Sequence, residues 1–279
     1  MPTASTNVII LTNDGPATRE VLAAAVANGD EALACATAQS GPWQETIGRG
    51  SQSISVLQPS LNWPTRGGKY LTWAHKKVLR QALGVPSITH LVYLEDDIGF
   101  TEDNLRYWMQ VRPALEPLCM IPGFLLFEQC EGERYLIQQT SAGQWRTVAE
   151  PIDIPGLGPV SLTRADLPYH ASYVMDRALA IEHFGRSAFR SQFRSRVAGW
   201  GITERAATGP LFEPSLTPLR NAVWLGSAPY LPPARSAVPV QLGDGGTVEV
   251  LEGALLEHLR PTYSTNPFSE SGKLPVEQF

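Results

Sequence analysis

The amino-acid sequence predicts an α/β fold with a mostly parallel central sheet, helices on both of its faces, and a mixed α+β second half. The chain opens with a strand–helix–strand pattern, in which the apolar runs Val8–Thr12 and Ala32–Ala38 flank a segment with helix start and stop signals, Thr18–Asn28. A later run, His90–Leu94, is apolar on both faces, as parallel strands buried between helix layers are.

The composition excludes several classes of protein. With 279 residues, 43% of them hydrophobic and 18% charged, the chain is long enough to bury a core and too apolar for wholesale disorder. The net charge of −5 gives no basic footprint for nucleic acid. No signal-peptide pattern and no apolar run of about 18 residues is visible, which predicts a cytoplasmic protein without a membrane span. Cys35, Cys119 and Cys130 are too few and too scattered for a disulfide framework, and we expect them to be reduced and mostly buried.

The remaining elements of the first half follow from the same signals. The Gly-, Ser- and Pro-containing segment Gly41–Gly68 is expected to be a loop with one short strand at Ile54–Leu57. The segment Lys69–Leu83 has the clearest helical periodicity in the chain. Thr101 is a good N-cap for a helix that runs to about Leu115.

From Gly123 onward the pattern changes to short strands and turns. We expect strands at Phe124–Gln129, Tyr135–Gln139 and Trp145–Val148 (the last two joined by a turn at 141–143), a Pro/Gly loop at Pro151–Gly158, a strand running into a helix over Ser172–Phe184, and a hairpin over Val238–Leu251. The residues after 258 are polar and are expected to be a flexible tail.

An acidic run, Glu95-Asp96-Asp97, directly follows the strand His90–Leu94, which is apolar on both faces. Ligands of open α/β sheets bind outside the carboxyl ends of strands, and adjacent carboxylates repel one another unless a cation lies between them. Because Glu95 and Asp97 face the same way in extended chain, they are candidate ligands of Mn²⁺ or Mg²⁺, and Asp96 is left to contact a sugar hydroxyl. The alternative is an acid-rich loop ahead of a helix.

Other polar residues are candidates for contacts with a substrate. Arg66 and Lys69 open a helix next to two glycines, a natural anion site, so they would contact phosphate or else lie on a solvated face. Asn13 and Asp14 end the first strand, where they would contact a nucleoside base or ribose, or simply form a turn. His170 precedes a predicted strand and is a candidate lining residue of an acceptor site.

The loop and helix from Arg66 to Lys76, the strand His90–Leu94 and the acidic run together resemble the core of GT-A glycosyltransferases. In that fold a basic or Gly-containing loop leads a helix, and the next strand ends in a DxD-type motif. The resemblance implies that Glu95-Asp96-Asp97 holds Mn²⁺ or Mg²⁺ on the diphosphate of a nucleotide-sugar, with Asp97 as the most direct ligand. It also implies a late histidine, here His258, as a further metal ligand, although a lone histidine is more often a core or surface residue.

A second segment, Gly199-Trp200-Gly201-Ile202-Thr203-Glu204, resembles the GWG-x-E segment of β-1,4-galactosyltransferase-like enzymes, with one extra residue before the acid. The resemblance implies that Glu204 lies near the acceptor hydroxyl. As a general base it would give an inverting reaction. Gly201 permits close backbone approach, and Trp200 offers a flat face for a sugar ring. The alternative is a core tryptophan followed by a solvated acid.

The sequence therefore leads us to expect a metal-dependent glycosyltransferase that moves a sugar from a nucleotide-sugar donor to a hydroxyl of a glycan or small-molecule acceptor. We expect a single GT-A-like domain with a nucleotide-sugar half (1–120), an acceptor half (121–258) and the tail (259–279). A nucleotidyltransferase of the same fold and a non-catalytic glycan-binding protein remain as alternatives. The first would usually carry a Gly-rich basic loop where this chain has residues 13–16. The sequence does not indicate the oligomeric state.

Overall fold

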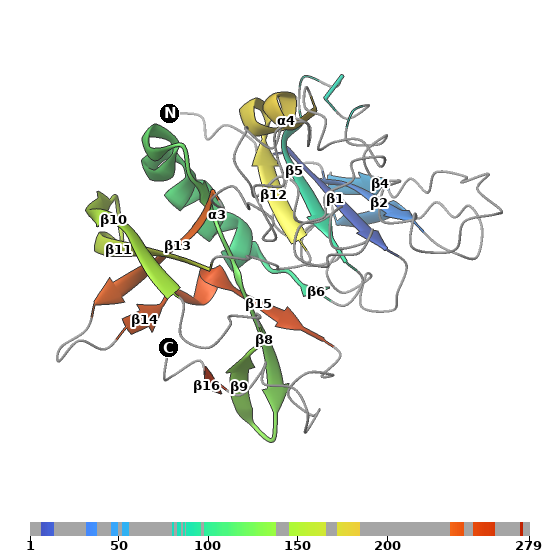
Figure 1. Cartoon of the computed structure of the whole chain (residues 1–279). Helices are drawn as coiled ribbons and strands as arrows, with labels where there is room; N and C mark the ends of the chain where they lie inside the picture. The colour runs from blue at the N-terminus through green and yellow to red at the C-terminus, as the bar shows by residue number, and fades with distance from the viewer. Residues whose placement is uncertain are drawn as a thin grey trace, which may run out of the picture. The chain divides into compact units, whose positions relative to one another are not determined.

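The computed structural model describes residues 7–13, 32–37, 46–49, 52–55, 80, 83–84, 86, 88–95, 98–137, 145–165, 172–184, 235–242, 248–259 and 274–275. These residues form both helices and strands, in agreement with the predicted α/β class (Figure 1). The chain divides into two compact units. Unit 1 comprises residues 1–97, 171–210 and 214–232, and unit 2 comprises residues 98–170, 211–213 and 233–279.

Unit 1 contains a six-stranded sheet with the strand order β12-β5-β1-β2-β4-β3 (Figure 1). Its strands are β1 (Asn7–Asn13), β2 (Ala32–Thr37), β3 (Thr46–Arg49), β4 (Gln52–Ser55), β5 (Ile88–Leu94) and β12 (Ser172–Asp176). β1 pairs in parallel with β2 and β5, and β2 pairs in parallel with β4. β12 is antiparallel to β5, and β3 is antiparallel to β4. The middle of the sheet is therefore parallel, and both edges are antiparallel.

β5 is buried because both of its faces are apolar. The side chains of residues 91–94 are each at most 1% exposed. The ring of Tyr93 stacks on that of Tyr173 in β12, with the ring centroids 5.1 Å apart. β12 continues into helix α4 (Arg177–Phe184), where Asp176 Oδ1 accepts a hydrogen bond of 2.7 Å from the Leu179 amide. An acidic side chain before a helix satisfies an amide that has no partner within the helix.

Unit 2 contains helix α3 (Glu102–Leu115) and two five-stranded sheets. One sheet has the order β10-β11-β13-β14, with β7 paired to β13, and the other has the order β16-β9-β8-β15-β6. The remaining elements are β6 (Ile98–Gly99), the 3-10 turn η2 (Glu116–Leu118), β7 (Ile121–Pro122), β8 (Leu125–Cys130), β9 (Glu133–Leu136), β10 (Trp145–Ile154), β11 (Gly158–Ala165), β13 (Ser236–Leu242), β14 (Val248–Val250), the 3-10 turn η7 (Glu252–Ala254), β15 (Leu255–His258) and β16 (Leu274–Pro275).

Several predicted elements are confirmed in the described residues. The strands predicted at 8–12, 32–38 and 90–94 correspond to β1, β2 and β5, and the helix predicted from 101 to 115 is α3. The strand and helix over 172–184 are β12 and α4, and the late hairpin is β13–β14. The helix predicted at 18–28 lies outside the described residues, as does most of the helix predicted at 69–83. The division into halves at residue 120 stays a prediction.

The loop predicted at residues 151–158 is wrong. β10 continues to Ile154, and after three intervening residues β11 begins at Gly158, antiparallel to β10. The backbone of Gly156 and Gly158 has positive φ angles of 83° and 76°, which glycine adopts without steric cost. Glycine here makes a tight reversal rather than a long loop. The turn predicted at 141–143 lies outside the described residues. The strands before and after it pair elsewhere, because β9 pairs with β8 and β16 whereas β10 pairs with β11.

Three smaller expectations also differ from the structure. Cys119 is exposed rather than buried, and Cys130 is half-buried, although both thiols are free as expected. The strand β3 was not predicted within the loop segment 41–68. In the tail expected to be flexible, β16 pairs with β9.

Candidate functional site

The acidic run begins at the carboxyl end of β5, whose residues 91–94 are buried. Leu94 is the last residue of β5, and Glu95 follows it with a half-buried side chain whose Oε1 atom is buried. Asp96 and Asp97 lie outside the described residues. The strand therefore delivers the first acid of the run to the sheet edge where open α/β folds bind ligands.

The sheet brings a second predicted site residue to the same edge. In the parallel pair of β1 and β5, Thr12 lies opposite Leu94. Asn13, the last residue of β1, is therefore the neighbour of Glu95 along this edge, with a strand spacing of about 4.8 Å. Ser172 also lies opposite Leu94, so β12 starts at this edge (Figure 1).

His90, the histidine of β5, lies within the sheet rather than at the edge that carries Glu95. It lies nearer the amino end of the strand, opposite Asp176 of β12. Burial lowers the pKa of His90, and the carboxylate of Asp176 opposes that shift. Its Nδ1 atom lies 2.9 Å from Thr89 Oγ1. These contacts keep a neutral imidazole away from the edge that carries Glu95.

In unit 2, the imidazole of His258 contacts a buried carboxylate. Its Nδ1 atom lies 2.8 Å from Glu128 Oε1. The side chain of Glu128 is 0% exposed and that of His258 is 10% exposed. An ionised carboxylate only accepts hydrogen bonds, so it favours the neutral tautomer with the proton on Nδ1. The lone pair of that tautomer lies on Nε2, and metal-ligating histidines commonly have their other ring nitrogen held by a carboxylate in this way.

Strand pairing fixes the position of His258 within unit 2. β15 pairs in parallel with β8, where Glu257 lies opposite Phe127, and antiparallel with β6, where His258 lies opposite Ile98. Ile98 is the residue that follows Asp97 in the sequence. The register thus sets His258 against the first residue after the acidic run.

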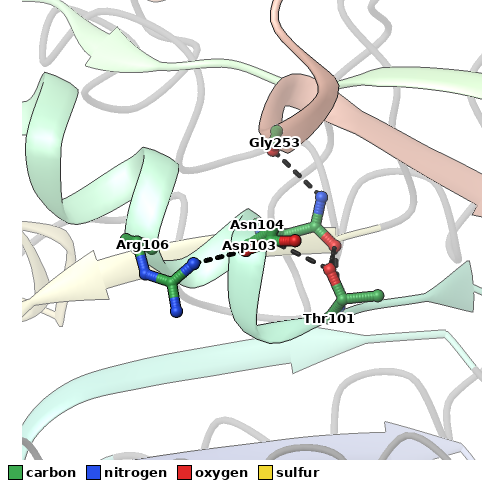
Figure 2. A network of polar contacts seen from close by, with 5 residues as sticks. All are labelled: Thr101, Asp103, Asn104, Arg106 and Gly253. Carbon is green, nitrogen blue, oxygen red and sulfur yellow. Dashed lines mark hydrogen bonds and ion pairs between the residues drawn. The ribbon is translucent and has the colours of Figure 1, made fainter.

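A buried asparagine joins the start of α3 to the segment that leads into β15. Figure 2 shows Asn104 between Thr101 and Gly253. Its Oδ1 accepts from the Thr101 amide at 2.7 Å, and the Asn104 amide donates to Thr101 Oγ1 at 3.4 Å, which completes a capping box. Its Nδ2 donates to the carbonyls of Gly253 and Leu255 at 2.9 and 2.7 Å.

The close packing of η7 against α3 requires a glycine at residue 253. A Cβ at Gly253 would lie 2.5 Å from Tyr107 Cβ and 2.8 Å from the Asp103 carbonyl oxygen, closer than real side chains approach. η7 can therefore reach α3 only without a side chain at residue 253. Together with Asn104, this contact holds the start of β15 against the helix that follows the acidic run.

Most of the other predicted site residues lie outside the part of the chain that the structure describes. They are Asp14, Arg66, Lys69, Asp96, Asp97, His170, Trp200, Gly201 and Glu204. Their assigned roles stay predictions. The described residues place Asn13 and Glu95 at one sheet edge of unit 1, and His258 beside β6 in unit 2.

Glu128 was not predicted as a site residue. The sequence predicts only a short strand at 124–129, and no local motif marks the single acid in it. One signal was available, because Glu128 shares a strand face with the buried Leu126, where an acid is expected only if it is partnered. Its partner comes from a strand distant in sequence.

No group of three or more His, Cys, Asp or Glu side chains suited to a metal is found among the described residues, which do not include Asp97. In that same part of the chain, no helix has the length and apolar character needed to cross a membrane. No family model matches the sequence. No curated protein matches it with significance either.

Proposed function

We propose that the chain is a metal-dependent glycosyltransferase that moves a sugar from a nucleotide-sugar donor to an acceptor hydroxyl. The proposal assigns Glu95, Asp97 and His258 as metal ligands and Glu204 as the catalytic base. It assigns a GT-A-like fold to the chain, a finer statement than the mixed α/β class. The acceptor is a glycan or a small molecule with a free hydroxyl.

One observation carries the proposal. His258, expected as a late metal ligand, lies opposite the residue that follows the acidic run, and a buried carboxylate holds its Nδ1 atom. A lone surface histidine has neither feature. The donor set of two carboxylates and one imidazole also suits Mn²⁺, which accepts oxygen and nitrogen ligands.

The sheet of unit 1 supports the donor half of the proposal. Its central strands are parallel, and β1 and β5 bring Asn13 and Glu95 to one edge. A nucleoside and its diphosphate bind at such edges in open α/β sheets. Asn13 and Asp14 would contact the base or ribose, and Arg66 and Lys69 would contact the diphosphate.

In the proposed reaction the acceptor hydroxyl attacks the anomeric carbon of the donor sugar. Glu204 takes the hydroxyl proton as the new C–O bond forms. The bond between the anomeric carbon and the diphosphate oxygen breaks, and its electron pair leaves with the diphosphate. Glu95, Asp97 and His258 would hold a divalent cation, which would neutralise that developing charge. Attack opposite the leaving group inverts the anomeric carbon, while Trp200 and Gly201 would position the acceptor together with His170.

Thermal unfolding with a panel of UDP-, GDP-, CMP- and dTDP-sugars, with and without Mn²⁺, tests the donor site. A ligand at 100 times its Kd stabilises the folded state by about 2.7 kcal/mol. For a chain of this size that raises Tm by roughly 5 °C or more. We expect such a rise with one nucleotide only, dependent on Mn²⁺ and absent from Asp97→Ala.

Asp103→Ala is the matched control, because Asp103 is an exposed acid in the helix that follows the acidic run. This variant should keep the full shift. No shift with any donor, in the presence or absence of a candidate acceptor, would contradict the proposal. Binding without Mn²⁺-dependent release of nucleoside diphosphate would favour the glycan-binding alternative instead.

A further inference from the structure

We propose that Glu128 is a positioning residue that fixes the ring of His258, so that this histidine binds the metal through Nε2. The inference rests on the proposed function, since that function assigns the metal to His258. Glu128 itself contacts neither metal nor substrate in this account. It acts through the histidine.

The geometry gives Glu128 control over the ring. The two side chains come from neighbouring parallel strands, β8 and β15, and join at 2.8 Å between Glu128 Oε1 and His258 Nδ1. β15 is paired on its other side with β6, so the backbone of His258 is fixed in the sheet. With the backbone fixed and Nδ1 bonded, the ring has one orientation and one favoured tautomer.

The position of Glu128 is costly for an acid, which argues that the contact has a role. Its side chain is fully buried, on a strand face shared with Leu126, and strand β9 continues the sheet on the other side. Burying a carboxylate is unfavourable unless partners compensate for the lost water. A leucine of similar size would fill this place without that cost. The contact with His258 is an interaction that compensates the Glu128 carboxylate for this cost.

Nitrogen NMR of ¹⁵N-histidine-labelled protein tests the inference on the full chain. The chain has five histidines, and the signals of His258 are those missing from His258→Asn. In the native protein we expect the tautomer with the proton on Nδ1. We also expect Mn²⁺ with UDP to broaden the His258 Nε2 signal before any other histidine signal.

Glu128→Gln is the informative variant because it preserves the volume of the side chain. An amide offers either an oxygen or an NH₂ group to Nδ1, so it no longer selects one tautomer. We expect a mixture of tautomers and a rise of about 10-fold or more in the Mn²⁺ concentration needed for broadening. Glu257→Gln is the matched control, since the adjacent Glu257 points to the opposite face of the same strand, and it should behave as the native protein.

Two results would overturn the inference and leave the proposed function standing. One is a native His258 with its proton on Nε2, which is measured without Glu128→Gln and so decides the matter even if that variant fails to fold. The other is native-like Mn²⁺ broadening in Glu128→Gln. Absence of Mn²⁺ broadening at His258 in the native protein would also overturn the inference about Glu128. The proposed function is then decided by a separate experiment, the rise in Tm with a donor and its loss in Asp97→Ala.

Discussion

The hydroxyl of Tyr107 is a single buried group with a measurable contribution to stability. It donates a hydrogen bond of 2.9 Å to the Gly123 carbonyl, and its ring lies 5.7 Å from that of Phe124. Tyr107→Phe keeps the ring and leaves the carbonyl without this donor. We expect the free energy of unfolding to fall by about 1–2 kcal/mol, measured by urea denaturation.

Tyr135→Phe is the control at the same scale. Its hydroxyl also makes a hydrogen bond, 2.6 Å to Glu133 Oε2, but at an exposed site. Water can replace that bond, so the loss should stay within about 0.5 kcal/mol. Equal losses in the two variants would mean that burial of the Tyr107 bond contributes nothing.

Individual site residues were predictable only where a local pattern marks them. The acidic run could be recognised because three acids directly follow a strand that is apolar on both faces. In the structure Glu95 directly follows the end of β5. Glu128 had no such mark beyond its apolar neighbours, because its contact partner is 130 residues away. A hydrogen bond between two strands depends on which strands are neighbours, and short-range periodicity does not contain that information.

At the scale of elements, the contact between α3 and η7 holds the start of β15, in addition to the pairing of β15 with β8 and β6. Asn104→Ala removes both donors to the Gly253 and Leu255 carbonyls and one half of the capping box. Leaving buried carbonyls without a donor costs about 1–3 kcal/mol each. We expect the free energy of unfolding to fall by about 2–4 kcal/mol, measured from the urea midpoint.

Asp103→Ala is the neighbouring control. Asp103 pairs with Arg106 on the solvent side of the same helix turn (Figure 2). Exposed pairs of this kind contribute about 0–1 kcal/mol. If Asp103→Ala lowers stability as much as Asn104→Ala does, then the joint between α3 and η7 is not the source of the effect.

The contact between α3 and η7 shows which features of an element the local sequence predicts and which it does not. Thr101 as a helix N-cap follows from local sequence, and the structure confirms it. Asn104 in the same helix start also donates a hydrogen bond to the Leu255 carbonyl. That carbonyl is 151 residues away, so the local sequence does not predict the contact. The tight turn between β10 and β11 was missed for a different reason, since Pro and Gly occur both in long loops and in three-residue reversals.

At the scale of the whole molecule, buried tyrosines predict a loss of stability at alkaline pH. Burial raises the pKa of Tyr107 in unit 2 and of Tyr173 in unit 1. Above about pH 10 the unfolded chain releases these phenolic protons, while the folded chain keeps them. The unfolded state then binds fewer protons, so the free energy of unfolding falls as the pH rises.

The expected size is up to about 1.4 kcal/mol per pH unit for each buried tyrosine above pH 10. Urea denaturation between pH 8 and pH 11 measures it. Tyr107→Phe and Tyr173→Phe together should flatten the alkaline slope relative to the native protein. An unchanged slope in the double variant would show that other groups cause the loss.

The mixed α/β content is the feature of the whole chain that the sequence indicated best. A strand apolar on both faces, with residues 91–94 buried, needs cover on both sides, and that requirement is visible in the sequence. The division of the chain into units that each use several separate segments was not visible. Such a division depends on contacts between residues far apart in the chain.

The position of β15 also bears on how the protein is made. β15 lies between β8 and β6, yet it is synthesised well after both. At about 5–20 residues per second, the ribosome takes on the order of ten seconds to pass from β8 to β15. During that interval the facing edges of β8 and β6 have no strand between them, and such edges pair readily with other chains. We therefore expect the nascent chain to be most exposed to aggregation, and to depend most on chaperones, just before Leu255–His258 leaves the ribosome.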